Sequence, residues 1–160
     1  MLRFRYLLIF AVLIVMVACS STQEVQVTKE MNEVITSYIK DHYKNIYYED
    51  NEQFEAHKVY GAEGKGGFIS VYIYSVYTEF TKNDPIERAG HSLPALIRLE
   101  KDGDTYKVIQ YKEPEDGSLY VSSIKKMFPK KYVNQALNDS GNVPELHKQI
   151  DEQVQKWKNG

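Results

Sequence analysis

The spacing of apolar residues predicts a helix in residues 28–47. The apolar positions recur at intervals that place them on one face of a helix, which is the pattern of a helix packed against a core. Thr28 is suited to the N-cap position, and the charge of Glu30 is favourable in the first turn. The apolar face comprises Met31, Val34, Ile35, Tyr38, Ile39 and His42.

The segments that follow this helix have the composition of strands. Residues 53–60 form the first, and the glycine-rich residues 61–67 are expected to form a turn. Residues 68–80 are rich in β-branched and aromatic side chains and are apolar on both faces, so we expect a central strand that is covered on both sides. Residues 91–101 and 106–113 flank a turn sequence and predict a hairpin.

Two helices are expected after the strands, over residues 118–128 and 144–157. Pro129 ends the first, and Pro144 lies at a favourable first-turn position of the second. The order of helix, about four antiparallel strands and two helices predicts an α+β fold, in which the N-terminal helix packs on a curved antiparallel sheet. This order of elements resembles the cystatin-like and nuclear-transport-factor-2-like folds.

The chain begins with the charge and hydrophobicity pattern of a secretory signal. Arg3 and Arg5 precede an unbroken apolar run over residues 7–18. As a helix this run would reach roughly 18 Å, which is short of the roughly 30 Å hydrocarbon core of a bilayer. The alternative is a spanning helix that extends back to Leu2, with the two arginines reaching the membrane surface.

The residues that close this run, the sequence MVAC at 16–19, resemble the lipobox of bacterial lipoproteins. The resemblance implies that the thiol of Cys19 carries a diacylglyceryl group, that the signal is cut before this residue, and that the new amino group is acylated, for example with palmitate. It implies a signal peptide over 1–18, a lipidated cysteine and tether over 19–27, and one domain over 28–160. An ordinary cleavable signal that ends near a cysteine is the other interpretation.

Composition is consistent with export. Cys19 is the only cysteine, and a lone free thiol is a liability in an oxidising compartment, whereas a thioether is not. Removal of Arg3 and Arg5 from the 20 basic residues leaves 18 against 22 acidic residues, a net charge near −4. No basic stripe or arm occurs, so a nucleic-acid partner is not expected.

A second resemblance covers residues 90–129. The spacing of glycine, proline and aromatic residues there is similar to that of a small extracytoplasmic domain, which occurs in lipoproteins of Gram-positive bacteria and fused to membrane sensor peptidases of the BlaR type. The H-E-x-x-H zinc motif of the peptidase part is absent from this chain, so no proteolytic role is implied. The same residues also have a purely structural explanation as turn formers and core aromatics.

Histidine is the residue type most suited to catalysis here, but its four occurrences lie in separate elements without metal-ligand spacing. We therefore expect no metal and no cofactor. His91 is the best candidate for a reactive residue because it begins a strand after a polar loop. The adjacent Ser92 should point to the opposite face of the strand, which argues against direct activation. The other histidines are His42, His57 and His147.

Carboxylates gather in two stretches, residues 49–55 and 113–116, and each is expected to be a solvated face or turn. Glu55 belongs to the first of these stretches. Residues 49–52 lack the alternating ligands and the terminal glutamate of a calcium-binding loop.

Tyrosine is the most distinctive residue type, with 13 occurrences. Tyrosines on a curved sheet can line a pocket and offer hydroxyl groups to a ligand. Alternatively, they serve cross-strand packing. The candidate ligand-binding residues are Tyr72, Tyr74, His91 and Tyr111, and no residue is assigned a catalytic role.

These features favour a non-enzymatic binding, sensing or interaction module, anchored by lipid to the outer face of a Gram-positive cell membrane. Its expected partners are the membrane and a protein or small molecule outside the cell. One alternative is a small hydrolase or isomerase with a cone-shaped pocket, in which His91 or a buried carboxylate is the base. Another possibility is a homodimer formed through the sheet or the last helix.

Overall fold

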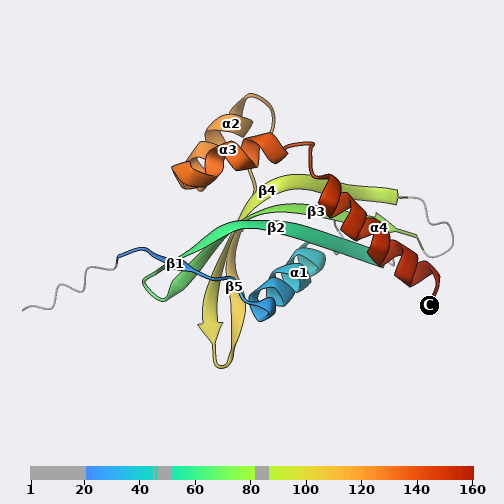
Figure 1. The fold of residues 1–160 in the computed structure, drawn as a ribbon, viewed down its shortest axis with the longest axis horizontal. Coiled ribbons are helices and arrows are strands. Elements are labelled where there is room, and N and C mark those ends of the chain that lie inside the picture. Colours follow the sequence, from blue (N-terminus) through green and yellow to red (C-terminus); the bar gives the residue numbers. More distant parts are fainter. Residues whose placement is uncertain (1–20, 45, 47–51, 82–86) are drawn as a thin grey trace, which may run out of the picture.

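The computed structural model describes residues 21–44, 46, 52–81 and 87–160, and it has an α+β fold. Five antiparallel strands form one curved sheet in chain order, with helices on both faces (Figure 1). The expected fold class is therefore confirmed. The elements are β1 (Gln23–Val25), α1 (Lys29–Tyr43), β2 (Glu52–Lys65), β3 (Phe68–Phe80), β4 (Glu87–Asp102), β5 (Thr105–Lys112), the 3₁₀ turn η1 (Gly117–Leu119), α2 (Tyr120–Met127), α3 (Lys130–Asp139) and α4 (Pro144–Lys158).

The sheet has one strand more than expected, because β1 lies inside the segment assigned to the tether. Gln23 pairs with Gly64, and Val25 pairs with Ala62. A strand therefore precedes the first helix. The strand β2 continues to Lys65, so only Gly66 and Gly67, both with positive φ, form the turn that was expected over 61–67.

Three helices, not two, follow the sheet. Pro129 ends α2 as expected, but its extended backbone also makes it the N-cap residue of α3, which the sequence analysis missed. Pro144 opens α4 as expected. In the part of the chain that the structure describes, no helix is long and apolar enough to cross a bilayer.

The helix α1 covers one face of the sheet, which we call the α1 face (Figure 1). The predicted N-cap is confirmed, since the Thr28 hydroxyl accepts a hydrogen bond from the backbone N–H of Met31 at 3.2 Å. Tyr43, and not His42, completes the buried side of the helix, because the apolar stripe turns slightly around the helix axis; His42 is exposed. The core on this face joins Met31, Ile35, Ile39 and Tyr43 to Val71, Ile73, Ala95, Ile97 and Leu99.

The opposite face, which we call the α4 face, carries α2, α3 and α4 (Figure 1). The strand β3 is buried between the two layers, as its apolar faces predicted. One cluster joins α4 to the sheet and the other joins α2 and α3 to it. The first contains Phe54, Ala56, Tyr74, Val76, Leu146, Ile150 and Val154, and the second contains Tyr72, Leu96, Ile124, Phe128, Tyr132, Val133 and Ala136.

Three shifts of register shape the sheet. The register between β2 and β3 shifts between Val59 and Gly61, and that between β4 and β5 shifts between Arg98 and Leu99. The third shift, between β3 and β4, lies between Glu79 and Phe80. Bulges bend a strand and redirect its side chains. At the first bulge, a Cβ atom on Gly61 would overlap the hydroxyl of Tyr132, so the glycine allows α3 to approach the sheet.

Candidate functional site

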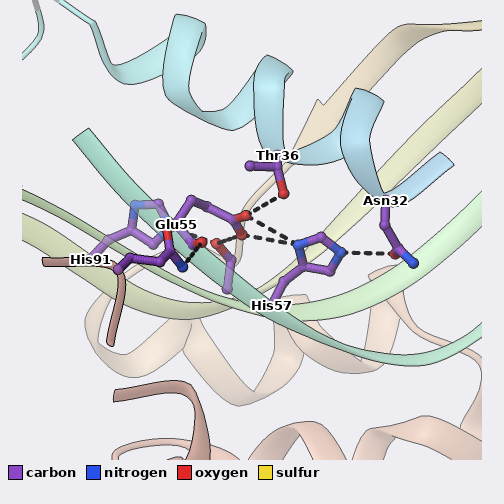
Figure 2. A network of polar contacts seen from close by, with 7 residues as sticks. Asn32, Thr36, Glu55, His57 and His91 are labelled. Carbon is purple, nitrogen blue, oxygen red and sulfur yellow. Dashed lines mark hydrogen bonds and ion pairs between the residues drawn. The ribbon is translucent and has the colours of Figure 1, made fainter. Parts of the chain in front are cut away.

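A buried polar network lies between α1 and the sheet, and Glu55 is at its centre (Figure 2). The side chain was expected in a solvated stretch, but the residue is only 3% exposed. One carboxylate oxygen accepts a hydrogen bond from the Thr36 hydroxyl at 2.7 Å, and the other accepts one from the Ser75 hydroxyl at 3.1 Å. The carboxylate therefore links α1 to two strands of the sheet.

His57 extends this network toward the start of α1 (Figure 2). Its Nδ1 lies 3.1 and 3.2 Å from the two oxygens of Glu55, and its Nε2 lies 3.0 Å from Oδ1 of Asn32. Each ring nitrogen therefore lies within hydrogen-bond distance of a side-chain oxygen, and the imidazole joins the buried carboxylate of Glu55 to the first turn of α1.

His91 reaches the same network through Ser75, since its Nε2 lies 3.2 Å from the serine hydroxyl oxygen. Ser75 donates its own hydrogen to Glu55, so Nε2 of His91 is the donor to Ser75. Nδ1 of His91 is buried and has no hydrogen-bond partner among the described residues. Burial lowers the pKa of His91 to about 4; Glu55 opposes this shift and His42 adds to it.

This geometry does not activate a nucleophile. In a catalytic triad the carboxylate contacts the histidine, and the histidine accepts the hydroxyl proton. Here the Ser75 hydroxyl donates its hydrogen directly to the carboxylate of Glu55, and Nε2 of His91 donates to the hydroxyl oxygen of Ser75. Ser75 is also fully buried. The network therefore fastens α1 to the sheet.

Tyr111 lies near one end of the same layer, beside the C-terminal end of α1. Its hydroxyl donates to a carboxylate oxygen of Glu113 at 2.8 Å, and the hydroxyl of Tyr43 donates to the same oxygen. The rings of Tyr38 and His42 lie 5.8 and 5.1 Å from that of Tyr111. Desolvation, followed by the nearby charge of Asp116, raises the pKa of Glu113. These contacts pack the C-terminal end of α1 against β5.

Tyr74 lies on the α4 face and is fully buried. Its hydroxyl donates to the carbonyl oxygen of Ser92 at 3.1 Å and accepts from the backbone N–H of Gly141 at 3.3 Å. It holds the connection between α3 and α4 against the sheet. The four candidate residues therefore do not form one site: Tyr72 and Tyr74 lie on the α4 face, whereas His91 and Tyr111 lie on the α1 face.

A surface groove on the α4 face contains the remaining candidate, Tyr72. It consists of two adjoining hollows of about 440 and 330 Å³, which share Ser70, Tyr72 and Arg98. We call it the Arg98 groove. The larger hollow is also lined by Leu96, Gln110, Lys112, Glu113, Glu115, Ser123, Lys126 and Met127, and the smaller by Thr22, Glu63, Lys65 and Phe68.

Arg98 is the notable residue of this groove. It is half-buried beside the second β-bulge, and its guanidinium forms no hydrogen bond or ion pair with any described residue. By contrast, Glu63 across the groove is already paired with Lys131 at 3.0 Å. Because no described residue accepts a hydrogen bond from it, the guanidinium is available to an anionic ligand.

The lysines of the groove add to this unbalanced charge. Lys65, Lys112 and Lys126 are exposed, and none forms an ion pair with another described residue. Of the carboxylates, Glu113 is held by two tyrosine hydroxyls, and Glu115 is exposed at the far end of the larger hollow. The excess positive charge is therefore concentrated at the end formed by Arg98 and Lys65.

The sequence analysis named Tyr72 but missed Arg98 and Glu55. Arg98 alternates with Ile97 and Leu99, so the sequence does place it on the face opposite the α1 core. The groove itself depends on where α2 crosses the sheet, which no local pattern specifies. Among the described residues, no group of three or more histidine, cysteine or acidic side chains could hold a metal ion.

No protein-family model matches the chain, and neither the curated proteins nor the solved structures yield a match.

Proposed function

We propose that this chain is a lipid-anchored binding protein on the outer face of a cell membrane, in which Cys19 carries the anchor and the Arg98 groove takes the ligand. The lipobox sequence at 16–19 supports the anchor. The observation that carries the binding role is Arg98, a half-buried residue whose guanidinium forms no ion pair among the described residues.

Binding has better support than catalysis because the reactive groups and the groove are separate. Glu55, Ser75 and His91 contact one another on the α1 face, whereas the groove lies on the α4 face and neither of its hollows is lined by a histidine. The hydrolase or isomerase alternative would require substrate to reach Ser75 or Glu55, of which at most 3% is exposed.

The anchor is tested on the native protein. Mass spectrometry of protein made in a Gram-positive host should find Cys19 as the first residue, with a diacylglyceryl group on its sulfur. Cys19→Ser should move the protein out of the membrane fraction, because no acyl chain can then be attached. The matched variant Ser21→Ala should stay in the membrane fraction. Retention of residues 1–18, or an unmodified thiol at Cys19, would refute the anchor.

A further inference from the structure

The smaller hollow of the Arg98 groove opens next to the proposed anchor. Thr22 lines this hollow, and the following residue, Gln23, is already paired in the sheet with Gly64. Only three residue steps separate Thr22 from Cys19, and three extended residues span at most about 10 Å. If the function proposed above holds, the mouth of the groove therefore lies within about 10 Å of the lipid attachment point.

This mouth combines positive charge with an apolar rim. Lys65 and Arg98 line it, and its one carboxylate, Glu63, is neutralised by Lys131 at 3.0 Å. Phe68 lines the same hollow, and the residue is 38% exposed. An exposed aromatic ring beside unpaired cations suits a ligand whose anionic group is joined to apolar chains.

The donors inside the mouth fit a tetrahedral oxyanion. An arginine guanidinium offers parallel N–H groups that bind two phosphate oxygens at once. Burial, and then the nearby charge of Glu63, raises the pKa of Tyr72, so its hydroxyl keeps its hydrogen at neutral pH. Ser70 adds a second hydroxyl to the part that both hollows share.

We propose that the Arg98 groove binds a phosphate group, which Arg98 holds with help from Lys65 and Tyr72. Such a group is supplied by a phospholipid headgroup or by a soluble phosphate ester. The position of the mouth beside Thr22 favours the headgroup. The larger hollow, of about 440 Å³, has the size of a small-ligand site and accommodates the polar part attached to the phosphate.

The test uses the full lipidated protein, purified in a non-ionic detergent. Its melting temperature is measured against increasing glycerol 3-phosphate and, separately, against short-chain dihexanoyl phosphatidylglycerol, with sodium chloride at equal ionic strength as the reference. A saturable rise in melting temperature is expected because a ligand that binds only the folded state stabilises it. Equal responses to both probes assign a soluble phosphate ester as the source, and a response to the lipid alone assigns the headgroup.

Substitutions locate the site. Arg98→Gln should weaken the apparent affinity by about tenfold or more, and Arg98→Lys by less, because the charge remains while the paired N–H groups are lost. Lys65→Gln, at an exposed residue, should weaken it by about threefold and serves as the second variant if Arg98→Gln fails to fold. Lys148→Gln, on α4 and outside the groove, should bind like the parent.

Two results would overturn the inference: no rise beyond that caused by sodium chloride, or an unchanged response in both Arg98→Gln and Lys65→Gln. The anchor is judged independently by the mass of the native N-terminal peptide. An unmodified Cys19 with intact phosphate binding would remove the membrane location and leave the site. A lipidated Cys19 without phosphate binding would leave the membrane location and remove the phosphate site.

Discussion

Among single residues, Glu55 makes the most consequential contacts. Its carboxylate accepts hydrogen bonds from Thr36, Ser75 and His57, and its backbone carbonyl accepts one from the side chain of Gln153 at 2.9 Å. Because Gln153 belongs to α4, this one residue is in contact with the helices on both faces of the sheet. The stability of the layered structure should therefore depend strongly on it.

Glu55→Ala should lower the free energy of unfolding by about 3 kcal/mol or more, because it leaves the ring of His57 and the hydroxyl of Ser75 buried without their partner. Urea denaturation measures the change. Glu33→Ala is the control, since this side chain is 64% exposed and pairs only with Lys29; it should change stability by less than about 0.5 kcal/mol. A loss below about 1 kcal/mol for Glu55→Ala would contradict the structural role of the network.

His91 should make stability depend on pH. Its pKa is about 4 in the folded chain and 6.5 when unperturbed, so the unfolded chain takes up a proton first as pH falls. The free energy of unfolding should therefore fall between pH 6.5 and pH 4 and level off below that, by at most about 3 kcal/mol. The change follows from burial, and it is opposite in direction to that of a histidine held by a salt bridge.

The contribution of His91 is isolated by comparing urea denaturation near pH 7 and near pH 4.5 in His91→Gln and in the parent chain. The variant retains an N–H donor for Ser75 but does not titrate, so its stability should fall less over this interval. His147→Gln, at an exposed position of α4, should keep the slope of the parent. Identical slopes in all three proteins would exclude the buried neutral state of His91.

At the scale of elements, α3 fits closely against β2. The hydroxyl end of Tyr132 occupies the space that a side chain at Gly61 would need. Gly61→Ala should lower the free energy of unfolding by about 2 kcal/mol, the usual cost of overpacking. In a Tyr132→Ala background the same substitution should cost much less. Additive losses in the double variant, measured by urea denaturation, would mean that the two residues do not interact.

The elements were predicted correctly where the apolar pattern was long. They were missed where the element was short or where one residue both ends a helix and begins the next. β3 was predicted with its observed bounds because the strand is 13 residues long and apolar side chains predominate on both of its faces. β1 has only three residues, too few for a period to be recognised, and it is stabilised by its pairing with β2. The pattern around Pro129 predicts only the end of a helix, although a proline also suits the residue that begins the next one.

At the scale of the whole molecule, the alternation of apolar and polar residues and the lengths of the connections determine the fold class more than composition does. A meander of neighbouring antiparallel strands with helices at either end leads to an α+β fold, and this much was predictable. The candidate tyrosines and His91 were grouped by residue type, without regard to the strand face that each occupies. Pairing of Tyr77 with His91 places the histidine beneath α1, on the face opposite Tyr72. The assignment of a common site therefore required knowledge of the strand register.

If Cys19 carries the proposed anchor, the edge strand β1 also limits how far the domain stands from its attachment point. With β1 paired, residues 20–22 separate Cys19 from Gln23, and these four residue steps reach at most about 14 Å. Detachment of β1 from β2 would free the chain up to Thr28, the N-cap of α1, and extend the reach to about 30 Å. A force on such an anchor would therefore act first on a three-residue strand at the edge of the sheet, which is joined to β2 alone. Loss of this pairing would let the domain move away from the proposed membrane surface, and its return would bring the domain back.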